Sequence, residues 1–321
     1  MTAEVADVVD RLAGASRIGL GLAAVGRPAY INLGRAEDLP AERTVEAMRS
    51  RAHELLDTAY ANGVRYFDVA RSYGRAEEFL AQWLEGKNDV VVGSKWGYTY
   101  TADWRMDAEV NEVKDHGVAT FERQLGETRA LLGDRLDLYQ IHSLTPDSSA
   151  LHDTELHERL AAQGVVVGFS TSGPRQAETI RAALAIRVGG RPLFRSVQAT
   201  WNLLEPSAGP ALAEAHEAGC LVIVKEALAN GRLAVEGPGD AVALAAALRQ
   251  PWATIVLSGA ATADQLASNL RAETMNPRAE TMNPRAETMN PRAETISARF
   301  DPDLAMPADR YWQERSRLPW A

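Results

Sequence analysis

The 321-residue chain has a single cysteine, Cys220, no surplus of positive charge, and no apolar stretch approaching about 18 residues. One cysteine excludes an internal disulfide, and its apolar neighbours indicate a buried thiol. A net charge of -9 argues against a general polyanion binder, so we expect no nucleic-acid partner. The acidic amino-terminal residues and the missing apolar run predict neither a signal peptide nor a membrane segment, and they indicate a cytoplasmic protein.

What the chain does contain is a regular alternation of short apolar runs and helical patterns. Eight apolar runs begin near residues 18, 64, 90, 136, 165, 196, 221 and 254. Continuous apolar runs are typical of parallel strands buried on both faces. They predict a (β/α)8 TIM barrel over residues 1–270. A doubly wound open sheet is the alternative, but it should carry a phosphate-loop glycine fingerprint after the first strand, and the sequence has none.

The segment after residue 270 departs from this alternation. Arg-Ala-Glu-Thr-Met-Asn-Pro occurs at 271–277, 278–284 and 285–291, and a fourth copy begins at 292. A proline in each copy would cost a helix about 3 kcal/mol, which excludes a continuous helix. We expect residues 271–295 to be a mobile tandem repeat at the surface. Residues 296–321 contain several aromatic residues and are predicted to pack on the barrel as a C-terminal tail.

Polar side chains follow the second, third and fourth predicted strands. Asp68 ends the second strand, Tyr73 follows five residues later, and Lys95 and His142 end the next two. Each has an ordinary structural explanation when taken alone, such as a helix cap, a packed ring or a surface lysine. Because the carboxyl ends of parallel strands meet at one rim, the four groups together favour a common site.

The combination of a phenol, an ammonium, a carboxylate and an imidazole indicates a tuned proton donor. Free tyrosine has a pKa of about 10, and a nearby lysine is expected to lower it. The carboxylate would hold that lysine in place, and the imidazole would orient a carbonyl oxygen. Such a site protonates an oxygen that becomes negative as hydride reaches the carbon, so a cofactor must supply the hydride.

The stretch Asp68-Val-Ala-Arg-Ser-Tyr73-Gly74, followed by Lys95 and His142, resembles the catalytic tetrad of the aldo-keto reductases. The similarity covers roughly residues 15 to 270. It implies an NAD(P)(H)-dependent oxidoreductase that reduces an aldehyde or ketone to an alcohol, or catalyses the reverse reaction. In this resemblance Tyr73 is the general acid, Lys95 and Asp68 tune it, and His142 positions a small carbonyl or alcohol substrate.

The resemblance also implies a set of cofactor-binding residues. Ser170 and Gln198 match positions that bind the carboxamide, and Leu22 and Ala23 fall near the nicotinamide. The loop residues Leu228, Ala229, Gly231 and Arg232 match positions that wrap the cofactor pyrophosphate. The positions that surround the adenosine end of the cofactor are matched by Gly259, Gln265 and Asn269.

Three positions depart from the family pattern. Lys225 stands where an aromatic ring usually stacks on the nicotinamide, and Thr171 replaces the residue after the carboxamide serine. The expected 2′-phosphate cradle at 260–262 lacks a basic residue, so NADP(H) is only slightly favoured over NAD(H). Arg232 or Arg271 could supply the missing charge.

Aromatic residues near the predicted rim are candidates for the substrate pocket, namely Tyr30, Trp96, Tyr98, Tyr100, Trp104 and Trp201. Tyr30, Trp96 and Trp104 are the residues predicted to contact substrate, and residues 96–117 are a candidate lid. The alternative function is a nucleotide-binding sensor or accessory subunit of the same fold with little or no turnover. A metal-dependent lyase would need more ligands than Asp68 and His142, so no metal site is predicted. The sequence assigns no oligomeric state.

Overall fold

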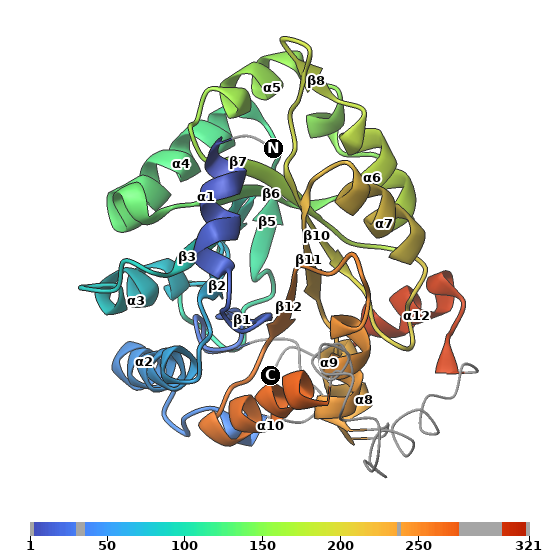
Figure 1. The fold of residues 1–321 in the computed structure, drawn as a ribbon. Helices are drawn as coiled ribbons and strands as arrows, with labels where there is room; N and C mark the ends of the chain where they lie inside the picture. Colours follow the sequence, from blue (N-terminus) through green and yellow to red (C-terminus); the bar gives the residue numbers. More distant parts are fainter. Residues whose placement is uncertain (1–2, 30–35, 236–238, 276–303, 319–321) are drawn as a thin grey trace.

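The computed structural model describes residues 3–29, 36–235, 239–275 and 304–318, and these form the predicted barrel. Eight parallel strands close into a ring in the order β1-β12-β11-β10-β7-β6-β3-β2 (Figure 1). Every strand lies where an apolar run predicted it. The strands are β1 (Ile18–Gly21), β2 (Tyr66–Asp68), β3 (Val91–Trp96), β6 (Leu138–Leu144), β7 (Val166–Thr171), β10 (Ser196–Thr200), β11 (Leu221–Lys225) and β12 (Ile255–Ser258).

Apart from α1, which precedes the first strand, the helices surround the ring on its outer side and follow the strands in chain order (Figure 1). Thr44, Asp153 and Thr262 begin three of them, because each side chain accepts a hydrogen bond from a backbone N–H of the first turn. The α-helices are α1 (Ala3–Leu12), α2 (Val45–Ala61), α3 (Ala76–Trp83), α4 (Val118–Leu132), α5 (Thr154–Ala161), α6 (Gln176–Leu184), α7 (Gly209–Glu217), α8 (Arg232–Val235), α9 (Asp240–Leu248), α10 (Ala263–Thr274) and α12 (Ala308–Arg315). Short 3-10 turns are η1 (Ala36–Asp38), η2 (Gly133–Arg135), η3 (Ser149–Leu151) and η4 (Ala229–Gly231).

The first helix seals the amino-terminal end of the barrel. Val5 and Val8 of α1 are buried in one apolar cluster with Tyr66 and other inward-facing strand residues. A Cβ at Gly19 would lie 2.8 Å from the Tyr66 ring, so this glycine makes room for a core side chain. With this end filled, the opposite rim, formed by the carboxyl ends of the strands, is left for a ligand.

Two short hairpins interrupt the alternation. β4 (Tyr98–Tyr100) pairs antiparallel with β5 (Glu112–Lys114) inside the predicted lid, and β8 (Arg187–Val188) pairs with β9 (Arg191–Pro192). The first hairpin follows β3, so it begins at the carboxyl-terminal rim. Among the described helices, none combines the length and apolarity that a membrane span requires.

The carboxyl-terminal part of the chain is described in two pieces. Helix α10 continues past residue 270 to Thr274, with Met275 as its C-cap, and the tandem repeat from residue 276 on lies outside the described residues. Further on, α12 buries Tyr311 and Trp312 in a cluster with Ala229, Leu233 and Ala243. This helix therefore packs on the segment that follows β11, next to the rim.

Candidate functional site

The four predicted tetrad residues converge at the carboxyl-terminal rim. Asp68 ends β2, Lys95 lies in β3, His142 lies in β6, and Tyr73 lies on the turn between β2 and α3. The turn is tight at Gly74, which has φ 59°, and a Cβ there would lie 2.5 Å from the Gly26 carbonyl oxygen. Glycine at this position thus lets the turn carrying Tyr73 pack against the loop after β1.

A buried ion pair joins two of these residues. The Lys95 ammonium donates to the Asp68 carboxylate and, at 3.0 Å, to the carbonyl oxygen of Val69. Lys95 is 1% exposed and Asp68 3% exposed. The other Asp68 oxygen accepts from Gln198 Nε2 at 2.9 Å and from the Tyr66 hydroxyl at 3.3 Å. The Asp68 carboxylate therefore holds the Lys95 ammonium in place and supplies the partner that a buried charge requires.

The Tyr73 ring lies against the lysine and the histidine. Lys95 Nζ is 4.9 Å from the ring centroid, and the His142 ring stands edge-on with centroids 5.5 Å apart. Arg27 also lies over this ring, with its guanidinium carbon 5.4 Å from the centroid. The predicted set of phenol, ammonium, carboxylate and imidazole is thus brought into one cluster.

The electrostatic setting of Tyr73 differs from the expectation. We expected Lys95 to lower the tyrosine pKa, but burial and then the Asp68 charge hold it above its ordinary value, while Arg27 acts in the opposite direction. The physical reason is that Asp68 compensates the lysine charge and burial removes water from a phenolate. Tyr73 is consequently a protonated phenol near neutral pH.

His142 is held neutral. Burial, followed by the charges of Lys95 and Lys225, keeps its pKa well below the ordinary value. Its ring lies 5.0 Å from that of Tyr98, and Ser72 Oγ approaches Nδ1 at 3.5 Å. A neutral imidazole beside a phenol can exchange hydrogen bonds with a carbonyl or hydroxyl oxygen without repelling nearby cations.

Arg27 was not among the residues that the sequence singled out. It is 3% exposed and donates to the Ser72 carbonyl at 2.9 Å and to Glu112 Oε2 at 3.0 Å. Glu112 belongs to β5, so this pair ties the β4–β5 hairpin to the turn that carries Tyr73. The sequence shows Arg27 only as a cation in an irregular polar segment, and its burial, which makes a partner necessary, is visible only in the fold.

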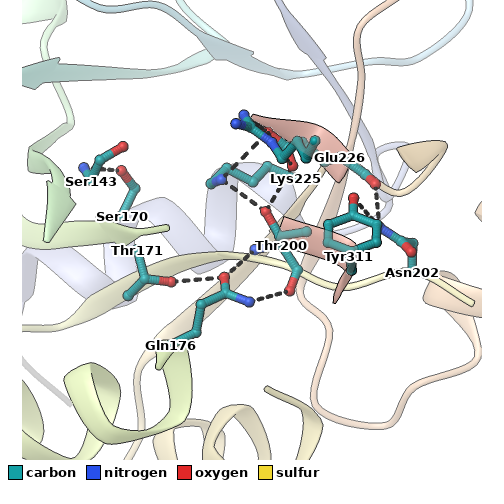
Figure 2. Close-up of polar contacts among 10 residues, drawn as sticks. Ser143, Ser170, Thr171, Gln176, Thr200, Asn202, Lys225, Glu226 and Tyr311 are labelled. Carbon is teal, nitrogen blue, oxygen red and sulfur yellow. Dashed lines mark hydrogen bonds and ion pairs between the residues drawn. The ribbon is translucent and has the colours of Figure 1, made fainter. Parts of the chain in front are cut away.

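The carboxamide-binding candidates occupy the ends of the next two strands. Ser170 Oγ accepts from the Ser143 backbone N–H at 2.8 Å, which leaves its hydroxyl proton to donate elsewhere (Figure 2). Gln198 lies opposite Ser170 in the register of β10 and β7 and contacts Asp68. Both therefore lie beside the tetrad. Leu22 and Ala23 follow β1, and the Leu22 N–H donates to the Asp68 carbonyl at 2.9 Å.

Thr171 has a structural partner. Strand side chains alternate in direction, so Thr171 points away from Ser170 toward α6. Its hydroxyl donates to Gln176 Oε1 at 3.0 Å, and Gln176 also bonds to both backbone groups of Thr200 (Figure 2). Thr171 therefore joins β7 to α6 and thereby to β10.

Lys225 ends β11 in a network of charges. Its ammonium donates to Thr200 Oγ1 at 2.9 Å and lies 3.8 Å from Glu226 Oε1 (Figure 2). Arg315 of α12 binds both oxygens of Glu226 through Nε, each at 3.0 Å. Burial lowers the pKa of Lys225 to about 8, although Glu226 raises it. Sequence reasoning identified Lys225 but not Glu226 or Arg315, which comes from the far end of the chain and pairs with Glu226.

Glu226 should make protein stability depend on pH. Burial alone would raise its pKa, but Lys225, Arg315 and Thr200 lower it from 4.5 to about 2. Because the pKa of Glu226 is lower in the folded protein than in the unfolded chain, its ionisation stabilises the fold at pH values above about 4.5. This stabilisation is lost as the pH falls toward 2. We expect Glu226→Gln to lower the free energy of unfolding by about 2 kcal/mol at pH 7 and by little near pH 2. Urea unfolding between pH 2 and pH 7 measures the difference in unfolding free energy between the parent and Glu226→Gln. The same difference at every pH would contradict a lowered pKa of Glu226.

The predicted pyrophosphate loop is covered by α12. Leu228 and Ala229 precede Gly231, and Arg232 donates to Glu314 at 3.1 Å while its guanidinium lies 4.5 Å from the Tyr311 ring centroid. Two buried polar atoms in this loop, Arg232 Nη2 and Asn230 Oδ1, have no hydrogen-bond partner among the described residues. An unpaired guanidinium N–H is a donor suited to an anion.

The predicted adenosine end lies after β12. Gly259 is exposed, Gln265 bonds to Asp38 Oδ2 at 2.7 Å, and Asn269 bonds to Ser258 at 2.8 Å. Arg51 of α2 donates to the Ala261 carbonyl at 3.0 Å, which brings a cation to this end that the sequence did not indicate. Arg271 is exposed and bonds to Ser268 at 2.7 Å.

The aromatic candidates lie in different places. Tyr30 falls outside the described residues. Trp96 is fully buried against Phe121 of α4, with ring centroids 5.0 Å apart, so its side chain lies between barrel and helix. Trp104 is half-buried and donates to the Arg43 carbonyl at 2.7 Å. Besides Tyr73, the aromatic side chain of Tyr98 lies against His142. In the described part of the chain, no three His, Cys, Asp or Glu side chains gather as a metal site would require.

Comparison with known proteins gives a consistent result. The model of the Aldo/keto reductase family matches residues 17–240. An uncharacterized oxidoreductase of Bacillus subtilis, YqkF, is 25% identical over 259 residues, covering 70% of this chain and 82% of the relative. A putative aldo-keto reductase from Pseudomonas aeruginosa has a similar structure, with TM-score 0.62, 24% identity, and coverage of 82% of this chain and 92% of that one. Aldo-keto reductase AKR11C1 from Bacillus halodurans, in its holo form, gives a TM-score of 0.61 at 20% identity, covering 92% and 93%.

Proposed function

Because the chain belongs to the aldo/keto reductase family, we propose that it interconverts a small carbonyl compound and its alcohol with NAD(P)(H), using Tyr73 as the proton donor. The observation that carries this proposal is the convergence of four side chains from three strands and one turn. Lys95 of the buried Lys95–Asp68 pair lies 4.9 Å from the Tyr73 ring centroid, and neutral His142 stands edge-on to the same ring.

The residues of the rim suit a nicotinamide dinucleotide. Arg232 offers a buried, unpaired N–H to a phosphate, and Ser170 retains a hydroxyl proton for a carboxamide oxygen. Gln198 lies next to Ser170 in the register of the strands and donates a hydrogen bond to Asp68, so it is also beside the tetrad. When bound, such a cofactor supplies or accepts the hydride.

The chain's own part in reduction is to hold and deliver a proton. Tyr73, protonated because its pKa is raised, donates from Oη to the carbonyl oxygen as negative charge develops there. His142 hydrogen-bonds the same oxygen and orients it, and Lys95 stabilises the resulting phenolate. In the reverse direction the phenolate of Tyr73 accepts the hydroxyl proton.

The choice between NADP(H) and NAD(H) depends on charges near the adenosine end. Arg51 places a cation beside Ala261, which suits a 2′-phosphate, whereas the Asp38 carboxylate beside Gln265 opposes one. We propose a slight preference for NADP(H), with Gly259, Gln265 and Asn269 at this end of the site.

Steady-state oxidation of NADPH and NADH with a panel of aldehydes and ketones tests the proposal. We expect turnover with at least one carbonyl compound and a modest preference for NADPH. Binding of either dinucleotide without turnover of any compound would instead indicate a sensor or accessory subunit. Absence of both binding and turnover would reject the proposed function.

A further inference from the structure

Arg27 is a buried cation that lies over the Tyr73 ring without being a member of the tetrad. It comes from the loop after β1, is 3% exposed, and holds its guanidinium carbon 5.4 Å from the ring centroid. Its Nη1 donates at 2.9 Å to the carbonyl oxygen of Ser72, the residue before Tyr73. One side chain therefore contacts the backbone that carries the phenol and also places a positive charge over its ring.

The tetrad lysine acts on the phenol together with its carboxylate. Lys95 Nζ is 4.9 Å from the Tyr73 ring centroid, but it is bonded directly to Asp68, whose charge opposes a phenolate. After burial, Asp68 has the largest influence on the pKa of Tyr73 and raises it, and Arg27 is the cation that lowers it most. The other titratable groups that act on Tyr73 or face its ring are Glu112, Glu226, His142 and Tyr66.

Glu112 supplies a counter-charge to Arg27. Its Oε2 accepts from Arg27 Nη1 at 3.0 Å, and its side chain is 23% exposed. Glu112 lies in β5, so the pair joins the β4–β5 hairpin to the loop after β1. The two charges act on Tyr73 with opposite signs, because Arg27 lowers its pKa and Glu112 raises it. This difference in sign separates an electrostatic role of the pair from a purely structural one.

We propose that Arg27 is a positioning residue for the reaction: it fixes the turn that carries Tyr73 and stabilises the negative charge left on this phenol by proton transfer. The inference rests on the proposed function. As hydride from the cofactor reaches the carbonyl carbon, the O–H bond of Tyr73 breaks, a new O–H bond forms on the substrate oxygen, and the electron pair stays on Oη. A guanidinium this close stabilises that phenolate, because burial leaves little water to screen the charges.

Titration of position 73 tests this without substrate or cofactor. A trifluorinated tyrosine, whose phenol is several pH units more acidic than that of tyrosine, replaces Tyr73 by amber suppression, and its fluorine NMR shift is followed against pH. We expect Arg27→Met to raise the pKa at this position by about 1 pH unit and Glu112→Gln to lower it by about 0.5. Arg27→Lys keeps the positive charge and should stay within about 0.5 of the parent.

The signs of the two changes distinguish the proposal from a structural role. Both substitutions break the same ion pair, so if the pair only anchored the hairpin, both would admit water and lower the pKa of Tyr73. Changes of the same sign, or an unchanged pKa in Arg27→Met, would overturn the inference. Arg27→Gln retains a donor for the Ser72 carbonyl and serves if Arg27→Met does not fold.

A second arginine provides the matched control. Arg65 lies over the Tyr60 ring, with its guanidinium carbon 4.0 Å from the centroid, and pairs with Asp89 at 2.8 Å. It precedes the amino-terminal end of β2, away from the carboxyl-terminal rim. Arg65→Met should therefore leave the fluorine titration at position 73 unchanged.

Kinetics connect the titration to the reaction. With the carbonyl compound that the parent reduces fastest, Arg27→Met should lower kcat about tenfold and change KM less than threefold, because a less acidic phenol donates its proton more slowly. Arg27→Lys should recover most of the loss, and an unchanged kcat in Arg27→Met would also overturn the inference. Failure of the parent to reduce any carbonyl compound would instead reject the proposed function, while the fluorine titration would still show whether Arg27 acts on Tyr73.

Discussion

Replacing Tyr73 with phenylalanine is expected to lower kcat about 1000-fold while changing the dissociation constants for dinucleotides less than threefold, since a general acid typically contributes factors of this size. The ring contacts with Lys95 and His142 remain, and only the donated proton is lost. Steady-state kinetics and calorimetric binding measure the two effects separately.

The matched control is Tyr60→Phe. Tyr60 lies on α2, where its hydroxyl donates to Asp89 at 2.8 Å. Removing that hydroxyl should leave kcat within about twofold, because this hydrogen bond is exposed and lies before the amino-terminal ends of β2 and β3, whereas the tetrad lies at the carboxyl-terminal rim. Activity in Tyr73→Phe equal to that of the control would remove Tyr73 from the proton-transfer role.

Lys95→Met should damage both stability and activity. It leaves the Asp68 carboxylate buried without its cation, which typically costs about 3–5 kcal/mol in the free energy of unfolding. The phenolate formed by proton transfer also loses its stabilising charge, so we expect kcat to fall by at least about 100-fold. Urea unfolding and steady-state kinetics provide the measurements.

A double variant separates the two effects. Lys95→Met combined with Asp68→Asn removes the unpaired charge, so most of the lost stability should return. Activity should not return, because the ammonium is still absent. A double variant as unstable as Lys95→Met would show that the ion pair is not the source of the loss, and a fully active one would show that catalysis does not need it.

The barrel and the convergence of the tetrad could be predicted because both follow from local patterns. Apolar runs mark buried parallel strands, and the polar residue at the end of each strand reaches the same rim. Asp68, Lys95 and His142 are placed by strand position alone. Tyr73 needs only the short turn closed by Gly74.

Side-chain direction could also have been predicted from the same patterns. Lys95 points into the rim, so the next residue along the strand, Trp96, must point outward toward α4. The same alternation turns Thr171 away from Ser170 and toward Gln176. Strand position alone was therefore insufficient to identify a substrate-facing ring.

Other features depend on contacts between distant parts of the chain. Arg27 reaches Glu112 of the β4–β5 hairpin, and Arg315 reaches Glu226 from α12. No periodicity connects such pairs. The raised pKa of Tyr73 depends on burial and on the pairing of Lys95 with Asp68, and both follow only from the folded arrangement.

The packing of α12 has a consequence for the order in which the protein matures during synthesis. Arg315 and Tyr311 are translated last among the described groups that border the β11 side of the rim, yet they bind Glu226 and Asn202. A nascent chain can therefore pair all eight strands before α12 is available to pack on the β11 side of the rim. A ribosome-bound chain halted before residue 304 should therefore resist proteolysis in its barrel but expose Ala229 and Leu233, which α12 covers in the finished protein.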